Sequence, residues 1–265
     1  MKQLILNELQ ITSPTITAAS ALINVNDRIF TVCDDQYGLY ELQNDLWIYH
    51  QDPNAPKLPI DEKELKAVKP DYEALLASVD EDNLLLIPSG PKANRTHVLS
   101  FSLLTNKFTP KNFELMYKNL WNEIPLINIE GAVLYKGNYL LLNRGIMSSK
   151  SSIIAVDSKT LEIEKVVEID LGIIGDVFLH GSELCIHENF LYALGVAEDA
   201  DNSYDDGPII GSSLCKISLT DFKVLDRWQF NLPIKAEGLC RWKDSWMICT
   251  DPDGAGASKF YSFST

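Results

Sequence analysis

Apolar runs that begin with a small or acidic residue recur along the whole chain. Their first residues are 53, 57, 53 and 54 positions apart: Ser20, Glu73, Glu130, Glu183 and Glu237. A fixed period of this length is typical of repeat proteins in which each unit is one supersecondary element. Five such units account for the chain.

Each unit predicts four short β-strands. The first strand is followed by an Asn, Asp or Gly turn and then by a more hydrophobic second strand, as in residues 28–35. A third strand alternates apolar and polar residues, and a fourth is more polar still. Hydrophobicity therefore falls from the first strand of a unit to the last, which indicates blades with a buried inner strand and an exposed outer one.

The fifth unit ends after its third strand, and residues 3–11 before the first unit have strand character. We expect this N-terminal strand to complete the last blade, because ring closure removes exposed sheet edges. The predicted fold is all-β: one domain over residues 1–265 that forms a single five-bladed β-propeller of four-stranded antiparallel blades. A two-sheet sandwich is the alternative, but it does not explain the even spacing.

Two connections are longer than a blade requires, and both are expected to be surface insertions. The first runs from Asp52 to Asp71 and contains a stretch, DEKELKAV, that predicts one or two helical turns. The second runs from Glu198 to Gly211 and is strongly acidic.

Composition and charge disfavour several classes of partner and enzyme. The 23 Lys and Arg against 37 Asp and Glu give a formal net charge of −14, which disfavours nucleic acid and membrane partners. The five scattered cysteines indicate neither a disulfide framework nor a zinc site, so we expect a cytoplasmic protein, and we expect a monomer. The motifs of serine hydrolases, zincins and dinucleotide-binding enzymes are missing from the sequence.

The repeated acidic positions predict a metal site. The inner strands of a propeller line its central channel, so their first residues should form a ring at one mouth: Ser20, Glu73, Glu130, Ser182 or Glu183, and Glu237. Converging carboxylates repel one another unless a cation neutralises them, and Ca²⁺ accepts six to eight oxygens. The alternative is that these residues bind backbone amides across neighbouring blades without a metal.

A second polar set lies where the second strands end on the same face. It includes Asp34, Asp35, Arg144 and Asp251, with the cations Arg95 and Lys150 in the loops beyond. Arginine binds phosphate and carboxylate groups through two parallel hydrogen bonds. We therefore expect Arg95, Lys150 and Asp251 to contact a small anionic molecule. The alternative is that these loop cations only neutralise nearby acids.

Two segments, NIEGAVLYKGNYLLLNRG and KAEGLCRWKDSWMICTDPDG, resemble the blade signature of propellers with an "EG" motif, such as the esterase-like phytase and SdiA-regulated groups. The five units and the segment FTVCDDQYGLYEL also look like the soluble calcium-activated nucleotidases (apyrases). That resemblance implies one axial calcium at the ring residues, with Asp34, Asp35 and Arg144 facing the substrate. The motifs fit equally a bacterial propeller family without an assigned activity.

Three functions are compatible with these patterns. The first is a calcium-dependent hydrolase of a small phosphorylated or anionic compound, with Asp34, Asp35 and Arg144 as catalytic residues. The second is a non-catalytic propeller that binds a ligand or a protein. The third is a glycosidase, which needs carboxylates at a set separation and for which the sequence shows no aromatic sugar platform.

Overall fold

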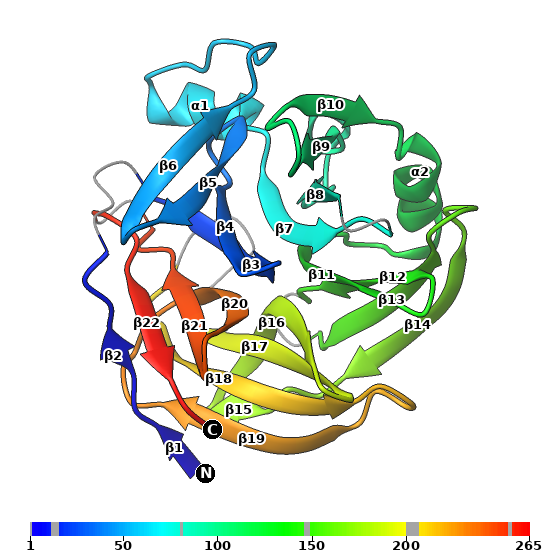
Figure 1. Cartoon of the computed structure of the whole chain (residues 1–265). Helices are drawn as coiled ribbons and strands as arrows, with labels where there is room; N and C mark the ends of the chain where they lie inside the picture. The colour runs from blue at the N-terminus through cyan, green and yellow to red at the C-terminus, as the bar shows by residue number, and fades with distance from the viewer. Residues whose placement is uncertain (1, 12–15, 80–81, 146–148, 200–206, 254–255) are drawn as a thin grey trace.

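A computed structural model describes residues 2–11, 16–79, 82–145, 149–199, 207–253 and 256–265. Five sheets lie around a central axis, as the sequence predicts, and each sheet has one inner strand beside the channel (Figure 1). The chain is therefore a five-bladed β-propeller. No helix among the described residues is long and apolar enough to cross a membrane.

The first three blades follow one another along the chain. Blade 1 contains β3 (Ala19–Val25), β4 (Arg28–Cys33), β5 (Gly38–Gln43) and β6 (Leu46–Gln51). Blade 2 contains β7 (Tyr72–Ala77), β8 (Asn83–Pro88), β9 (Val98–Ser102) and β10 (Phe108–Lys111). Blade 3 contains β11 (Ile129–Tyr135), β12 (Asn138–Asn143), β13 (Ser151–Asp157) and β14 (Ile163–Ile169).

The last two blades share the N-terminal segment. Blade 4 contains β16 (Val177–His187), β17 (Phe190–Glu198), β18 (Ile209–Ser218) and β19 (Val224–Phe230), with β15 (Ile173–Ile174) paired to β16. Blade 5 contains β20 (Ala236–Trp242), β21 (Ser245–Thr250) and β22 (Phe260–Phe263). The strand β2 (Asn7–Glu8) pairs with β22 and closes the ring as predicted, whereas β1 (Lys2–Leu4) pairs in parallel with β19 of blade 4. The N-terminus therefore joins two blades.

Local chemistry explains the hairpins of the inner strands. At the β3–β4 turn, Asn26 and Asp27 have φ values of 52° and 62°, the left-handed conformation that Asn and Asp tolerate best among non-glycine residues. This is the two-residue turn that follows the right-handed twist of the flanking strands. The prediction of Asn, Asp and Gly turns after the first strand is thus confirmed here.

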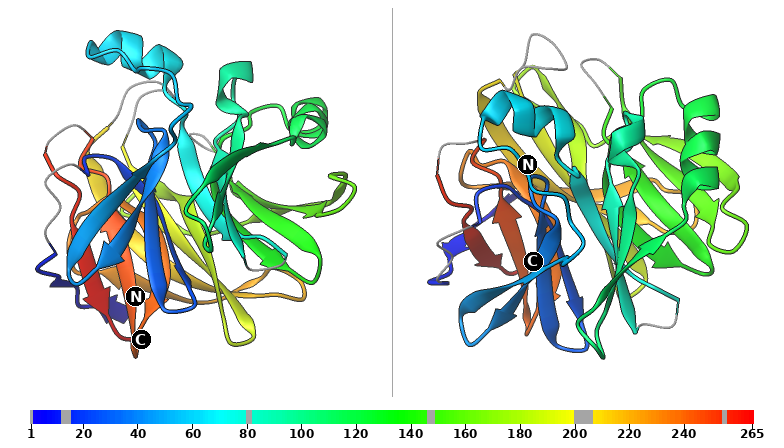
Figure 2. Two further views of the ribbon diagram at one scale, coloured as in Figure 1. Left: turned by 45° about the horizontal axis from the view of Figure 1, so that its top comes forward. Right: turned by 90° about the horizontal axis from the view of Figure 1, so that it is seen from above.

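Two helices and a short 3₁₀ turn lie outside the strands (Figure 2). The predicted helical turns in the first insertion are α1 (Glu62–Val68), which Asp61 caps by accepting a hydrogen bond from the Glu64 N–H. The rule of four strands per unit places the fourth strand of the second unit at residues 106–114; only β10 within that range is a strand, and α2 (Glu114–Glu123) begins shortly after it. The buried side chains of α2 pack between blades 2 and 3. Residues 200–206 of the second insertion lie outside the described part of the chain.

Hydrophobic clusters hold the blades together. The buried core divides into five clusters, and each cluster combines residues of two neighbouring blades. Three junctions between blades also have what we call a serine tie. In a serine tie, the hydroxyl group of a serine in one blade accepts a hydrogen bond from a backbone N–H near the start of the next inner strand. The pairs are Ser151 with Gly181, Ser212 with Ala236, and Ser258 with Ala19.

Candidate functional site at the channel mouth

Each inner strand has a β-bulge at the same place. The register with the second strand shifts by one residue in all five blades, and the additional residues are Ser20, Glu73, Glu130, Ser182 and Glu237. A bulge leaves its extra residue outside the hydrogen-bond ladder and redirects its side chain. The ring predicted from the repeat therefore exists, and in blade 4 the equivalent residue is Ser182 and not Glu183. We call the end of the channel at these bulges the mouth.

Small residues follow the bulge in four of the five blades. A Cβ added to Gly238 would lie 2.6 Å from the Leu22 nitrogen, and one added to Gly131 would lie 2.7 Å from the Leu184 nitrogen. The Glu-Gly pairs in the sequence therefore combine a bulge with the close approach of the neighbouring inner strand.

Glu183 occupies this position in blade 4 and is 1% exposed. Its carboxyl group accepts hydrogen bonds from the N–H groups of Leu184 at 2.8 Å and of Leu22, in blade 1, at 3.4 Å. Burial raises the pKa of Glu183 well above its usual value, while the two backbone N–H groups oppose that shift. Glu183 thus links inner strands of two blades that are not neighbours, whereas the metal-free alternative expected such bonds between neighbouring blades.

The first charged centre lies between blades 1 and 2. Asp34 follows β4 and Asp71 precedes β7, and the Lys69 ammonium group forms ion pairs with both of them, at 3.1 Å in the case of Asp71. Asp71 also accepts hydrogen bonds from Arg95 at 2.8 Å and from the Ser89 hydroxyl. Burial raises the pKa of Asp34 to about 6, although Lys69 opposes that shift. We call Asp34, Lys69, Asp71 and Glu73 the Lys69 centre.

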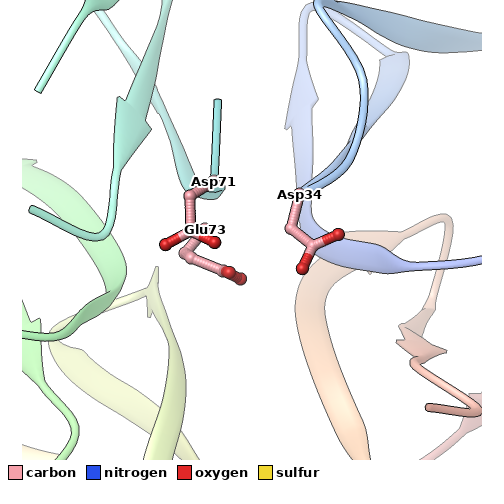
Figure 3. Close-up of side chains that lie close together, drawn as sticks. All are labelled: Asp34, Asp71 and Glu73. Atoms are coloured by element: carbon pink, nitrogen blue, oxygen red, sulfur yellow. The ribbon is translucent and has the colours of Figure 1, made fainter. Parts of the chain in front are cut away.

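Glu73 differs from the other acids of this centre. Figure 3 shows its carboxyl group beside Asp71 and directed toward Asp34, and ligand oxygens of the three residues lie within 4.8 Å of one another. Within the described part of the chain, Glu73 forms no ion pair or hydrogen bond through its side chain. Burial and the nearby Glu130 raise its pKa well above the usual value. Glu73 is thus a carboxyl group without a counter-ion of its own.

The second centre lies in blade 5. The Lys235 ammonium group is 2.6 Å from Asp253, 3.2 Å from Asp251 and 3.4 Å from Glu237. Burial raises the pKa of Glu237 to about 8, against the opposing effect of Lys235. We call these four residues the Lys235 centre.

A third charged contact joins blades 3 and 4. The Arg144 guanidinium group lies 2.8 Å from Glu198 and 3.6 Å from Glu130, and its side chain is 17% exposed. Burial raises the pKa of Glu130, while Arg144 opposes that shift. The Arg144 and Glu130 side chains, which the sequence assigns to the mouth, therefore meet there.

Of the other site residues predicted from the sequence, Asp35 and Arg95 lie at or beside the Lys69 centre, whereas Lys150 does not. Asp35 follows Asp34, and its Oδ1 atom is buried without a hydrogen-bond partner among the described atoms. Arg95 contacts Asp71 and the Lys66 carbonyl, so it lies at the Lys69 centre. Lys150 instead forms an ion pair with Asp170 at 3.3 Å, and both side chains are largely exposed.

The two serines of the ring donate hydrogen bonds to backbone carbonyl groups. Ser20 donates a hydrogen bond to the Ala18 carbonyl, and Ser182 donates one to the Ala236 carbonyl in blade 5. Their hydroxyl oxygens still have free lone pairs. The acids and not the serines therefore dominate the chemistry of the mouth.

The donor chemistry of the Lys69 centre suits a hard cation. Three carboxylates with a nearby serine hydroxyl offer only oxygen ligands, which Ca²⁺ and Mg²⁺ prefer. Asp34, Asp71 and Glu73 could therefore hold a metal ion, and this set shares only Glu73 with the predicted ring. The Lys69 ammonium group contacts two of the three carboxylates, so it competes with a metal for them.

Comparisons with known proteins establish the family. A family profile matches residues 15–264 of the chain. The chain belongs to DUF6929, a family of unknown function. The expected membership of the "EG" groups or of the nucleotidases is not shown by these comparisons. A search of curated proteins finds no match to this DUF6929 chain.

Several solved structures share the fold of the DUF6929 chain. One represents the GH130 family of mannoside phosphorylases, which contains glycoside hydrolases that target β-1,2 mannosidic linkages in Candida mannan; it has 8% identity and a TM-score of 0.57, over 97% of this chain and 93% of that one. A proposed glycoside hydrolase from Parabacteroides distasonis has 10% identity and a TM-score of 0.54, over 97% and 92%. A proposed oxidoreductase (glucose dehydrogenase) from Thermus thermophilus has 9% identity and a TM-score of 0.53, over 98% and 99%. At these identities the similarity shows the propeller fold alone.

Three residues of the DUF6929 site are not among the site residues predicted from the sequence: Lys69, Asp71 and Lys235. All three lie immediately before an inner strand, in Lys-Pro-Asp-Tyr and in Ile-Lys-Ala. The repeat pattern was aligned on the strands, so charges in the connections before them carried no weight. The signal that could have found them is the position of each charge one to three residues before an inner strand.

Proposed function

We propose that this chain is a metal-dependent hydrolase of a small phosphorylated or otherwise anionic compound, with a calcium ion at the Lys69 centre. The observation that carries the proposal is Glu73, a carboxyl group without a counter-ion of its own, whose ligand oxygens lie within 4.8 Å of those of Asp34 and Asp71. Unpaired carboxyl groups in such surroundings are costly unless they are protonated or bind a cation.

Asp34, Asp71 and Glu73 would hold the ion, with Ser89 as an additional oxygen donor close to Asp71. A bound hard cation supplies Lewis acidity toward a phosphoryl or carboxyl oxygen and orients a water molecule. Asp34 would then be a ligand, which differs from its predicted role as a base.

Other residues of the mouth can handle protons and charge. Asp35 has a buried oxygen without a partner among the described atoms and a pKa that burial raises, and both properties suit a general base. Glu237, with a pKa of about 8, is protonated at neutral pH and can donate a proton to a leaving group. Arg144 would stabilise negative charge that develops on the substrate, and Arg95 would help to bind it.

The test combines metal binding with a substrate screen. Calorimetry on chelator-stripped protein should show about one calcium ion per chain, and Glu73→Gln should abolish that binding. Hydrolysis of nucleotides and phosphate esters should require calcium and should fall by at least about 100-fold in Asp35→Asn and in Glu237→Gln. Glu188→Gln is the matched control, because this exposed carboxylate lies in the β16–β17 turn at the other end of the inner strand.

Aryl glycosides belong in the same screen, because two of the structural neighbours are described or proposed as glycoside hydrolases. Calcium-independent cleavage of a glycoside would replace the proposed reaction. Absence of saturable calcium binding in the wild-type protein would reject the metal.

A second candidate is a non-catalytic propeller that binds a ligand or a protein. It is favoured by the cations of the mouth, since Lys69 joins blades 1 and 2 and Arg144 joins blades 3 and 4. In that case the charged network would stabilise the ring only. The five cysteines are free thiols, which supports the proposal of a reducing cytoplasmic location.

A further inference from the structure

Lys69 reaches the mouth from an insertion and not from a blade. It follows α1 directly, and its backbone N–H donates to the Leu65 carbonyl at the end of that helix. The helix lies outside the strands and rests on the β8–β9 loop, where Arg95 donates to the Lys66 carbonyl and Asn94 to the Ala67 carbonyl (Figure 2).

The insertion buries little apolar surface. Ile60 is 99% exposed and Val68 is 46% exposed, and the five hydrophobic clusters contain no residue of α1. Segments with few buried apolar contacts open at a low free-energy cost. Hydrogen bonds to blade 2 and the ion pairs of Lys69 are therefore the main contacts of this helix among the described residues, since Leu65 is its only half-buried apolar residue there.

The Lys69 ammonium group lies where a metal ion would bind. It forms ion pairs with Asp34 and Asp71, two of the three residues that could hold the ion. A calcium ion binds carboxylate oxygens at about 2.3 to 2.6 Å, so an ion bound to both carboxylates would fill the same space as the ammonium group. The two cations exclude each other sterically and by charge.

The charge of the Lys69 centre favours replacement of the Lys69 ammonium group by the metal ion over binding of the ion beside it. The two ion-paired carboxylates, Asp34 and Asp71, balance Lys69 and Arg95 in the metal-free centre. Exchanging the ammonium group for a divalent cation that also binds an ionised Glu73 keeps the centre neutral, whereas retaining both cations makes it positive.

We propose that Lys69 is a displaceable counter-ion: it occupies the cation position in the metal-free protein and leaves with α1 when a divalent ion binds. This inference rests on the proposed metal site, and it adds that metal binding at the mouth is coupled to the position of the first insertion. The affinity for the metal would thus depend on how strongly Lys69 binds Asp34 and Asp71 and on how strongly α1 binds the β8–β9 loop.

The first test is calcium calorimetry on five chelator-stripped proteins. Lys69→Met should bind calcium at least about 10-fold more tightly than the wild type, because the competing charge is gone. Lys63→Met is the control, since Lys63 is an exposed lysine of the same helix and should leave the affinity unchanged. Lys69→Gln serves as a second variant if Lys69→Met does not fold, and Glu73→Gln should lose the binding.

The outcomes separate the two proposals. Equal or weaker binding by Lys69→Met and Lys69→Gln than by the wild type would overturn the displacement and leave the metal site intact. Absence of saturable binding in every protein, or unchanged binding in Glu73→Gln, would overturn the metal site and the displacement together.

The second test follows the helix itself. Hydrogen exchange of the α1 amides in the wild type should become faster when calcium is added, because Lys69 no longer holds the end of the helix. In Lys69→Met these amides should exchange fast without calcium and should not change when it is added. Unchanged exchange in the calcium-saturated wild type would show that Lys69 and α1 stay in place, which overturns the proposal.

Discussion

The Lys69 centre and the Lys235 centre are each made of one lysine and three carboxylates, yet they are built differently. Lys235 precedes β20 directly, and its ammonium group contacts all three acids of blade 5. Lys69 comes from an insertion, contacts two acids from two blades, and leaves Glu73 without an ion pair among the residues that the structure describes. The comparison shows that the same residue types give a cluster in which one lysine contacts every acid, and a centre in which one acid lies outside the ion pairs of the described residues; the second arrangement is the one we propose to be exchangeable.

The largest expected effect is on stability when the fixed cation is removed. Lys235→Met leaves the Asp251 and Asp253 carboxylates beside the buried Glu237 carboxyl group without their shared cation, and should cost about 3 to 5 kcal/mol of unfolding free energy. Lys69→Met should cost clearly less, because Asp71 keeps Arg95 and Ser89 as partners. Denaturant unfolding of both variants measures the difference, and equal losses would contradict the distinction between the two centres.

The Lys235 centre should also make stability depend on pH. The pKa of Glu237 rises from 4.5 to about 8 on folding, so the folded protein binds a proton that the unfolded chain releases. Stability from this group is complete below about pH 4.5 and is lost as the pH rises through about 8. The melting temperature should therefore fall by roughly 5 °C between about pH 6 and about pH 8.5.

Glu237→Gln isolates that contribution. The variant should show a much smaller dependence of the melting temperature on pH, because the titrating group is gone while the shape of the side chain is kept. An unchanged pH dependence would show that a group other than Glu237 causes the effect, and Asp34 is not that group, because its pKa of about 6 places its contribution below this pH range.

The serine tie behind the Lys235 centre should have a smaller effect. Ser212 accepts a hydrogen bond from the Ala236 N–H at 3.3 Å and donates one to the Ile234 carbonyl, on both sides of Lys235. Ser212→Ala should therefore cost about 1 to 3 kcal/mol, measured by denaturant unfolding. Ser218→Ala, on the same strand but bonded to the exposed Thr220 N–H and the exposed Asp221 carboxylate, is the control and should cost less than about 1 kcal/mol.

Glu73→Gln should change stability least. Glu73 has no ion pair to lose among the described residues, and its raised pKa means that ionisation is unfavourable in the folded state. The variant should therefore be as stable as the wild type within about 1 kcal/mol, and slightly more stable at high pH. A large loss of stability would show that Glu73 has a structural role and that the centres do not differ in the way proposed.

The fold was predictable because its signals are local and repeated. Strand alternation, the turn residues at Asn26 and Asp27, and the displaced N-terminal strand fixed five blades and the closure of the ring. The helix α2 was missed because its apolar positions resemble a strand followed by a loop, and because its burial between blades 2 and 3 decides its conformation. Pairing of β1 with β19 was missed for a similar reason, since three residues carry no sign of which blade they join.

The sequence alone determined that acidic residues recur at the start of the inner strands, and the period places them in one ring. Only the tertiary structure decided which charges meet them. Lys69, Asp71 and Lys235 lie in connections whose course depends on packing and not on periodicity, and a bulge selected Ser182 over Glu183. Periodicity specifies the strand from which a side chain comes, whereas the partner of a charge depends on distances between segments that are remote in sequence.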